Sequence, residues 1–507
     1  MGGPDKSGQA GLGATSLGLN SDCMQVNRII FFLMIFIAFS NCHYAQLDTL
    51  WSKNYGTETT ESMRQVHQTS DGGFIMVGEQ LWYNNTDPCQ IFLVKVDSIG
   101  NEEWRRQYGG YSYDVPYTVT LTSDNGFIIG GETTSYEKKG IFVLRLDSNG
   151  DSLWMTILGN ETIDHLTNKS AIVETENGDI LVTGWGWRPP NANQILLFKL
   201  DSTGNEIWEK NYGGNNDDFS SSILTVNSAS FLISGFTYSF GLGNTCDGYL
   251  IKINAQGDTI WTKTYGGDSY DSFHSVKNTY DNGFIAVGST QSFGNSEQGY
   301  LVKTDYEGNL EWQVDIGDSL IQGLLDVCPS SNHNFVACGY VLHIPSYHED
   351  ALLVHLDSDG KIIEQKIFTS KGISGISSIE RIFDNNFIGG GLISSTDNDP
   401  LDFWLIKFKL DQTTPEPTIP DNPILLQNFP NPFNNGTQIQ FILPKPARVV
   451  ITIFDILGNK VSVIADKEFE SGVQSVNFFP NNLSSGVYGY QIIVNEFIET
   501  RKMVFIK

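Results

Sequence analysis

Short stretches of alternating apolar and polar residues run along most of the chain, and they predict β-strands rather than helices. Residues 142–146 and 249–253 are typical, with the sequences Phe-Val-Leu-Arg-Leu and Tyr-Leu-Ile-Lys-Ile. A period of two places every second side chain on the same sheet face, so that one face can be buried. Asp-Asn-Gly and Asp-x-x-Gly sequences separate the stretches and supply residues that tolerate a positive φ. This pattern predicts an all-β protein built from short antiparallel hairpins.

An internal repeat sets the number of sheets. Six tryptophans recur at intervals of 50–54 residues, and Glu364 occupies the seventh equivalent place: Trp51, Trp104, Trp154, Trp208, Trp261 and Trp312. Each repeat contains four short strands, and one sheet of that size cannot bury both of its faces. Seven such sheets packed around an axis can bury them. Residues 47–410 are therefore predicted to form a seven-bladed β-propeller in which the N-terminal strand completes the last blade.

The hairpin that precedes each tryptophan has the pattern Asp-x-x-Gly-x-x-x-Trp, as in residues 201–208. It resembles the tryptophan-docking repeat of quinoprotein propellers, and residues 47–410 as a whole resemble the bacterial seven-bladed propeller repeat families. The resemblance implies that each tryptophan packs between neighbouring blades. It implies no activity, because propellers host binding, scaffolding, hydrolase and lyase functions alike.

The N-terminal segment predicts export. Residues 29–39 form an apolar run that is shorter than the roughly twenty residues needed to cross a bilayer as a helix. Arg28 precedes the run and Tyr44-Ala45-Gln46 follows it, which is the layout of a secretory signal. We interpret residues 24–45 as a signal peptide and residues 1–23 as a misannotated upstream extension. A lipoprotein anchored at Cys42 is the alternative.

A change of composition marks a second domain. Residues 411–423 contain four prolines and no apolar period, so we expect an extended linker there. In residues 424–507 short alternating stretches are separated by glycine turns, which predicts a small immunoglobulin-like β-sandwich.

Motif residues across this second domain resemble the type A sorting domain of the type IX secretion system. They are Asn428, Pro430, Asn431, Pro432, Phe433, Gly458, Gly486, Tyr488 and Lys502. The resemblance implies a bacterium of the Bacteroidota group, Sec export to the periplasm and recognition of this domain by the outer-membrane translocon. It also implies removal of the domain by a sortase-like protease, after which the protein is released or attached to the cell surface.

The charge balance excludes one class of partner. The chain has 58 acidic and 31 basic residues, and its formal net charge is −27. Almost all of this charge lies before residue 424, because residues 424–507 hold seven basic and six acidic residues. Binding to a phosphate backbone depends on Lys and Arg. We therefore expect no nucleic-acid partner.

The most distinctive polar constellation is acidic. A carboxylate stands six residues after the tyrosine (or its equivalent) that ends the tryptophan strand in five repeats, namely Glu61, Asp114, Asp164, Asp218 and Asp271, while Gln322 and Ser374 occupy this place in the other two. This position begins the innermost strand, so the carboxylates could ring one mouth of the channel and attract a cation or a cationic ligand. Ca²⁺ would suit such oxygen ligands, and no other cofactor is expected. Alternatively, each carboxylate caps its own turn by accepting backbone N–H groups.

Two further groups are candidates for binding. The variable loops between the second and third strands should crowd the same face as the acidic ring, and their aromatic residues would suit a sugar or protein surface: Trp82, Tyr83, Trp185, Trp187, Tyr238 and Phe240. For Trp185 and Trp187, packing between blades is the alternative. His343, His348, Glu349, Asp350 and His355 form a second cluster that either binds a transition metal or is a solvated loop.

Signatures of catalysis are few. The chain contains no His-Glu-x-x-His, no Gly-x-Ser-x-Gly and no phosphate-binding loop. We expect a monomeric, exported, non-catalytic propeller that binds an extracellular protein or glycan. The alternative is an extracellular glycosidase or lyase that uses propeller carboxylates as acid and base.

Four cysteines follow Ala45, namely Cys89, Cys246, Cys328 and Cys338. Either Cys328 and Cys338 form a disulfide across one hairpin, or both are buried free thiols.

Overall fold

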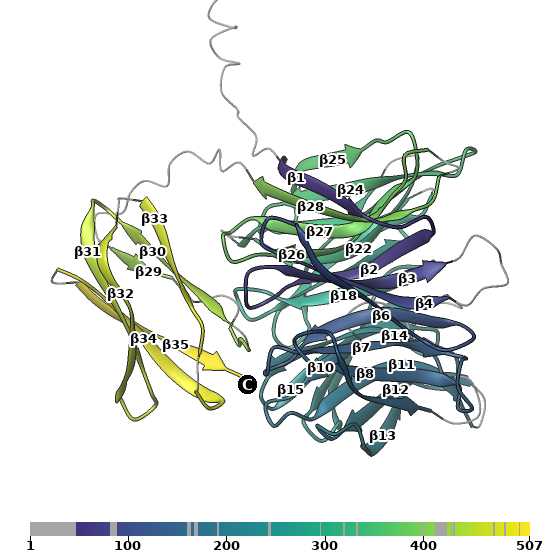
Figure 1. The fold of residues 1–507 in the computed structure, drawn as a ribbon, viewed down its shortest axis with the longest axis horizontal. Coiled ribbons are helices and arrows are strands. Elements are labelled where there is room, and N and C mark those ends of the chain that lie inside the picture. Colours follow the sequence, from purple (N-terminus) through teal and green to yellow (C-terminus); the bar gives the residue numbers. More distant parts are fainter. Residues whose placement is uncertain are drawn as a thin grey trace, which may run out of the picture. The chain divides into compact units, whose positions relative to one another are not determined.

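The computed structural model describes residues 47–81, 89–159, 164–166, 171–189, 192–241, 245–294, 296–317, 320–330, 333–396, 399–410, 423–426, 428, 431–434, 436–469, 472–480, 483–495 and 497–506. The elements in these ranges are β-strands, which confirms the all-β prediction (Figure 1). No helix in these ranges is long and apolar enough to cross a bilayer. The predicted signal peptide, the extension before it and nearly all of the linker lie outside the described residues.

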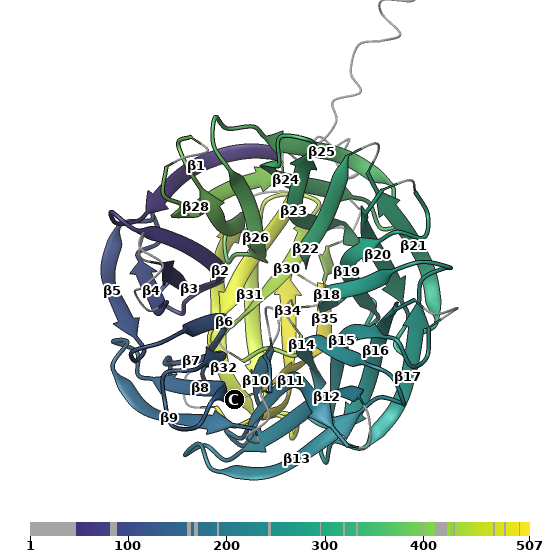
Figure 2. The ribbon, with the colours of Figure 1, turned by 90° about the vertical axis from the view of Figure 1, so that its right-hand side faces the viewer.

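Seven sheets of four antiparallel strands account for residues 47–410, and we number them as blades (Figure 2). Blade 1 holds β2 (Thr60–Gln68), β3 (Phe74–Leu81), β4 (Gln90–Val96) and β5 (Glu102–Tyr108); blade 2 holds β6 (Asp114–Leu121), β7 (Phe127–Thr133), β8 (Gly140–Leu146) and β9 (Ser152–Leu158). Blade 3 holds β10 (Ile172–Glu174), β11 (Ile180–Arg188), β12 (Ala192–Leu200) and β13 (Glu206–Tyr212); blade 4 holds β14 (Asp218–Asn227), β15 (Ser230–Thr237), β16 (Asp247–Asn254) and β17 (Thr259–Tyr265).

Blade 5 holds β18 (Asp271–Asn278), β19 (Phe284–Thr290), β20 (Gln298–Thr304) and β21 (Leu310–Ile316); blade 6 holds β22 (Ile321–Pro329), β23 (Phe335–His343), β24 (His348–Leu356) and β25 (Ile362–Phe368). Blade 7 holds β26 (Ser374–Arg381), β27 (Phe387–Ile393), β28 (Asp402–Leu410) and β1 (Leu47–Tyr55). The first strand of each blade lies near the axis and the last lies at the rim (Figure 2). Apolar side chains fill the space between neighbouring blades, as in the cluster that joins Met63 and Phe92 of blade 1 to Phe403 of blade 7.

Six of the seven rim strands contact the next blade through a tryptophan. Trp104 on β5 packs edge-on against Phe127 of blade 2, with ring centroids 6.2 Å apart. The same ring lies against Gly150 in the β8–β9 turn, where an added Cβ would come within 2.9 Å of it. Five other joints repeat the contact: Trp51 with Gly100, Trp154 with Gly204, Trp208 with Gly257, Trp261 with Gly308 and Trp312 with Gly360. The six tryptophans therefore lie between neighbouring blades.

Hydroxyl groups strengthen these joints. Tyr55 donates to the carbonyl oxygen of Gly100 at 2.7 Å, and Tyr265 donates to that of Gly308 at 2.6 Å. The turn glycine thus has two roles, because its φ of 76–87° suits glycine and its missing side chain makes room for the tryptophan.

The joint between blades 6 and 7 differs, and the chain connectivity explains why. β1 pairs with β28, with Leu47 opposite Leu410. Where the other blades have a turn between their third and rim strands, blade 7 therefore has the two ends of the propeller chain. Glu364 stands at the tryptophan position of β25 and accepts a hydrogen bond from the Leu47 N–H at 2.7 Å. With no turn glycine to pack against, a carboxylate that binds the first strand replaces the tryptophan.

A basic side chain lies at the same place on the third strand of every blade: Lys95, Arg145, Lys199, Lys252, Lys303, His355 and Lys407. In five blades it pairs with an aspartate of the turn between the first two strands, namely Asp71, Asp124, Asp179, Asp281 and Asp384. Blades 4 and 6 have no aspartate in this turn. There Lys252 lies 3.1 Å from the centroid of the Tyr306 ring, and burial lowers the pKa of His355 to about 4, so this imidazole is neutral.

Residues 424–505 form two sheets that face each other across one apolar core. One sheet has the order β29 (Ile424–Leu425), β30 (Thr437–Leu443), β33 (Gly472–Phe478). The other has the order β32 (Lys460–Phe469), β31 (Ala447–Phe454), β34 (Gly486–Val494), β35 (Phe497–Phe505). This arrangement is the small β-sandwich that the strand pattern predicts.

The four cysteines that the structure describes are buried, and none of them forms a disulfide. Cys328 and Cys338 both pack in the core of blades 6 and 7. Cys328 lies opposite Val336 and Cys338 lies opposite Asp326, so the two are offset along the hairpin. The disulfide alternative is therefore wrong for this structure.

The tryptophan–glycine contact predicts the result of a glycine comparison. Gly150→Ala adds a Cβ against the Trp104 ring at a φ of 80°, whereas Gly72→Ala has nearly the same φ, 83°, and no neighbour closer than 3.9 Å. Both changes should cost about 1 kcal/mol for the backbone, and Gly150→Ala should cost a further 1–3 kcal/mol for overpacking. Thermal unfolding of the full-length chain measures both, and equal losses would contradict the packing role of the tryptophan.

The pairs between a buried basic side chain and an aspartate of the turn predict a pH dependence. Burial would raise the pKa of Asp281, but hydrogen bonds from Lys303, Thr279 and the Gly283 N–H lower it below its usual value. Because this pKa is lower in the folded state, the pair stabilises the protein above about pH 4 and its contribution is lost as the pH falls through the folded-state pKa. Asp281→Asn should therefore lower the melting temperature by a few degrees at pH 7 and by less below pH 3.

Asp258→Asn is the matched control, because this carboxylate forms an exposed pair with Lys210. Its melting temperature should stay within about one degree of the natural chain at every pH. A loss as large as that of Asp281→Asn would show that burial of the lysine partner is not what matters.

Candidate functional site

The strand register defines two faces of the propeller. The innermost strand starts where the second strand ends, as in the pairing of Asp218 with Thr237. We call this edge the loop face, because it carries the variable loops and the connections between blades. The opposite edge carries the tight turns, and we call it the turn face.

The predicted carboxylates all lie at the loop face and all are buried. Asp218 accepts hydrogen bonds from the Gly214 N–H at 2.8 Å and the Ser239 hydroxyl at 2.7 Å, and also from Thr237. Asp114 and Asp271 have the same three kinds of partner. These bonds come from the connection that enters the blade and from the end of the blade's own second strand and the loop after it, as the turn-capping alternative predicts.

The other two carboxylates are bound within their own blades as well. Glu61 accepts hydrogen bonds from the Thr59 hydroxyl at 2.6 Å and the Gln80 amide at 2.8 Å. Asp164 accepts two from Arg188, at 2.7 and 2.9 Å. In the ranges that the structure describes, no three His, Cys, Asp or Glu side chains are arranged to hold a metal ion. Binding of Ca²⁺ at the ring stays a prediction.

The side chains that line the channel mouth come from the next position along each strand. The residue after each carboxylate pairs with a residue of the second strand, which gives Ser62 with Glu79, Val115 with Glu132, His165 with Trp185, and Phe219 with Phe236. Over blades 1 to 4 these positions and their neighbours form a row made of two groups of contacts, one from Arg64 to Tyr117 and one from Glu132 to Tyr238. We call it the mouth arc and define it by Arg64, Glu79, Tyr117, Glu132, His165, Trp185, Phe219, Phe236 and Tyr238.

The first half of the mouth arc is polar. Arg64 donates two hydrogen bonds to the carboxylate of Glu79, at 2.6 and 3.0 Å, and its guanidinium lies 5.6 Å from the centroid of the Tyr117 ring. Burial raises the pKa of Glu79 in spite of this partner. Glu132 follows, with its carboxylate 3.2 Å from Nδ1 of His165, and this hydrogen bond raises the pKa of His165. Arg64, Glu132 and His165 all keep a quarter or more of their side chains exposed.

The second half of the mouth arc is aromatic. The His165 ring stacks on Trp185 with centroids 4.3 Å apart, and Trp185 meets Phe219 edge-on at 4.8 Å. Phe219 stacks on Phe236 at 4.8 Å, and Tyr238 closes the row against both phenylalanines. These four aromatic side chains are half-buried, so parts of their rings face solvent.

Other exposed aromatic side chains lie on the connections of the loop face or, for Trp187, at the loop-face end of β11. They are between 38% and 100% exposed: Tyr111, Tyr113, Tyr136, Trp187, Phe240, Tyr270, Phe293 and Tyr347. Trp187 and Phe240 are thus exposed as the loop pattern predicts, and Trp185 packs against the neighbouring blade. Trp82 and Tyr83 lie outside the described residues.

Only part of the histidine cluster comes together. His343 and His348 lie opposite each other on β23 and β24, and their Nε2 atoms lie 3.1 and 3.3 Å from the two oxygens of the buried Asp350. His355 lies at the far end of β24, where Nε2 is 3.3 Å from the Asn334 amide. This cluster therefore does not gather the five residues of the sequence pattern.

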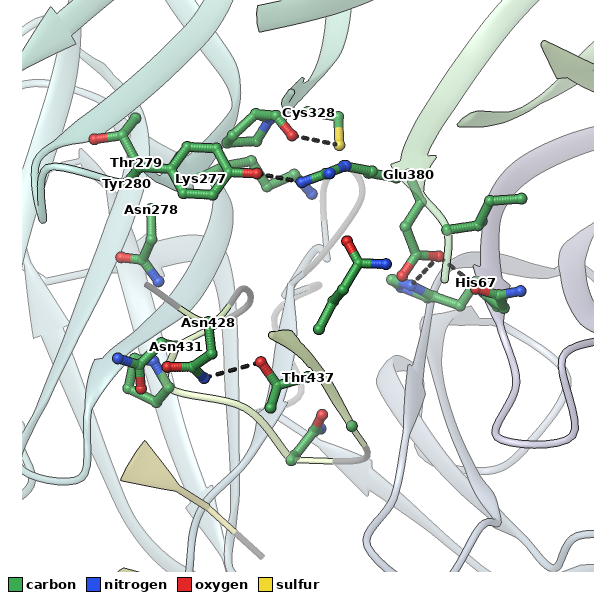
Figure 3. A pocket seen from close by; sticks show the side chains of 18 of the residues that line it. His67, Lys277, Asn278, Thr279, Tyr280, Cys328, Glu380, Asn428, Asn431 and Thr437 are labelled. Atoms are coloured by element: carbon green, nitrogen blue, oxygen red, sulfur yellow. Dashed lines mark hydrogen bonds and ion pairs between the residues drawn. The ribbon is translucent and has the colours of Figure 1, made fainter. Parts of the chain in front are cut away.

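The turn face has a charged channel mouth of its own (Figure 3). His67 of blade 1 lies 3.4 Å from Glu380 of blade 7, and Lys277 of blade 5 lies 3.3 Å from Asp326 of blade 6. Arg381 donates to the Tyr280 hydroxyl. These charges pair with one another between blades, so they link the inner strands.

The motif residues of the C-terminal domain gather at one end of its sandwich. Asn431 accepts a hydrogen bond from the Val504 N–H at 2.7 Å, and Phe433 forms a parallel bridge with Phe505. Gly486 and Tyr488 pair with the same last strand, opposite Phe505 and Met503. Pro430 lies outside the described residues.

Asn428 holds the segment before β30. Its side-chain amide donates to the Thr437 hydroxyl at 2.9 Å (Figure 3), and its N–H donates to the Tyr490 hydroxyl at 2.8 Å. Asn428 therefore connects the motif segment to β30 and to β34.

Residues 427–507 match the family described as the secretion system C-terminal sorting domain. The chain carries a type IX sorting domain. This domain directs export through the type IX secretion system to the cell surface or the extracellular space, and it implies an interaction with that machinery. No curated protein shows significant sequence similarity to the chain.

Several solved structures have a similar arrangement of strands. PorZ, an essential surface component of the type IX secretion system of Porphyromonas gingivalis, is 14% identical over 86% of this chain and 58% of that chain, with a TM-score of 0.38. Sqt1 from Chaetomium thermophilum is 11% identical over 78% of this chain and 97% of that chain, with a TM-score of 0.42. The β-propeller domain of the trilobed protease from Pyrococcus furiosus is 12% identical over 75% and 98%, with a TM-score of 0.39.

The capping bonds predict how a carboxylate variant behaves. Asp218→Asn leaves the donors of Gly214, Thr237 and Ser239 facing a group with one acceptor fewer. We expect a loss of about 1–3 kcal/mol, equal in Ca²⁺ and in a chelator. Thermal unfolding measures it, with Asp315→Asn, at an exposed position of β21, as the neutral control. If Ca²⁺ stabilised the natural chain but not Asp218→Asn, the cation ring would be supported instead.

Proposed function

We propose that the exported propeller binds a glycan at the mouth arc. The observation that carries the proposal is the group of contacts in which partly exposed aromatic rings adjoin the imidazole of His165 and the carboxylate of Glu132, with the Arg64–Glu79 pair on a nearby blade. A sugar ring presents C–H groups on its faces and hydroxyls at its edge. Aromatic faces can pack against the C–H groups, and bidentate polar groups can form hydrogen bonds with the hydroxyls.

The surrounding loop face supports the same proposal. Its exposed aromatic side chains extend the contact area beyond one sugar unit, and large aromatic groups dominate the energy of binding surfaces. Both carboxylates of the mouth arc already have a basic partner, Arg64 or His165, which favours recognition of hydroxyls over acid–base catalysis. A protein ligand would use the same aromatic rim.

The finer steps of export belong to this proposal as well. A signal peptide at residues 24–45 would open the Sec route in a Bacteroidota cell, and a sortase-like protease would remove the sorting domain. The monomeric propeller then acts outside the cell, either released or attached to the surface. The family match at residues 427–507 supports this route.

A glycan array probed with the full-length chain tests the proposed function. Trp185→Ala removes the ring that joins His165 to Phe219, so binding to the best glycan should weaken at least about tenfold. Ile99→Ala is the control, because Ile99 is 62% exposed in the turn between β4 and β5, on the turn face and away from the arc. Calorimetry gives the affinities, and thermal unfolding verifies that each variant is folded.

Three results would overturn the proposal. They are the absence of any bound glycan, equal binding by Trp185→Ala and the natural chain, and a protein ligand that competes for the arc. Release of reducing ends from a bound glycan would instead establish the enzymatic alternative.

A further inference from the structure

The turn between β31 and β32 of the sorting domain exposes two large apolar side chains. Ile456 is 77% exposed and Leu457 is 82% exposed, more than any other aliphatic side chain in the ranges that the structure describes. Adjacent apolar residues at the tip of a hairpin are unfavourable in water unless a partner covers them.

The turn does not need these side chains for its conformation. Asp455 accepts hydrogen bonds from the N–H groups of Leu457 and Asn459, at 2.9 and 2.8 Å, and from the Asn459 side chain at 2.9 Å. Gly458 follows with a φ of 83°. The backbone and one carboxylate hold the tip, and both apolar side chains project from it.

The propeller supplies internal comparisons, because it builds the same turn repeatedly. In blade 3, Asp201 accepts hydrogen bonds from the N–H groups of Thr203 and Asn205, both at 2.9 Å, and Gly204 has a φ of 87°. The two tip positions of these turns are mostly polar: Ser98-Ile99, Ser148-Asn149, Ser202-Thr203, Ala255-Gln256, Tyr306-Glu307 and Ser358-Asp359. A pair of large aliphatic residues occurs only in the sorting domain among these seven turns.

The tip lies at the same end of the sandwich as the motif residues. Phe454, the last residue of β31, pairs with Gly489, and Gly489 pairs with Lys502. Gly486 and Phe505 are paired at this end too. The apolar tip therefore adjoins the part of the domain where residues from its beginning, middle and end meet.

We propose that Ile456 and Leu457 form a docking contact that inserts into an apolar pocket of the type IX secretion machinery. The domain is already assigned to that machinery, and the tip has the rigidity and the exposed apolar surface that suit a receptor pocket. This contact is independent of the glycan proposed at the propeller, because it lies on another domain.

The test uses a turn that the chain already contains. Ile456→Ser combined with Leu457→Thr turns residues 455–459 into Asp-Ser-Thr-Gly-Asn, which is the sequence of residues 201–205. The full-length chain is expressed in a bacterium with a type IX system, and the cell-associated, periplasmic and extracellular fractions are measured. We expect export to fall at least about tenfold, with the folded chain retained in the periplasm.

Ile498→Ser is the matched control, since Ile498 is 60% exposed on β35 and pairs with Ile493 away from the tip. It should be exported like the natural chain. Thermal unfolding and glycan binding of the retained double variant show that both domains are folded, which separates a failure of this proposal from a failure of the proposed function.

Normal export of the double variant would overturn the proposal, as would an equal defect in Ile498→Ser. Light scattering on the purified natural chain tests whether a second copy of the chain binds the tip. A dimer that the double substitution dissociates would mean that a second copy covers the tip, and this too would overturn the proposal.

Discussion

One contact holds the propeller in register: a rim-strand tryptophan packed on the turn glycine of the next blade. Trp104 reaches Phe127 and Gly150 at once, so it fixes the second strand and the third-strand turn of blade 2 together. Because each blade contacts mainly its neighbours, the orientation of every sheet depends on this joint. At the joint between blades 6 and 7 the turn is missing, and Glu364, which accepts a hydrogen bond from the Leu47 N–H, replaces the tryptophan.

The register that these joints impose decides which side chains face the channel mouth. The repeated carboxylates begin the inner strands, yet their side chains turn into the blade and accept bonds from its own turns. One position further along, Phe219 and His165 face the mouth with their second-strand partners. A shift of one residue along a strand moves a side chain to the other face of the sheet. The repeat thus preserves the caps, while the mouth positions vary from blade to blade and can serve recognition.

The sorting domain obeys a different constraint, because its motif must gather from distant segments. Residues around Asn431, Gly486 and Phe505 meet only when β35 has paired with β34 and received the segment before β30. A tip with two exposed aliphatic residues adjoins this assembled end. The domain presents a folded surface, and recognition of such a surface depends on the sandwich being complete.

The sequence by itself determined the all-β class, the seven blades, the placement of the tryptophans and the export domain, because each of these depends on local periodicity or on a motif of fixed order. It also predicted the aromatic loop residues, of which Trp187 and Phe240 are exposed. Only the tertiary structure decided that Glu79, Tyr117, Glu132 and Phe219 share one arc with Trp185, since these residues lie on four blades and have no common motif. Side-chain direction at a channel mouth follows from strand twist and blade packing, and neither can be read from spacing along the chain.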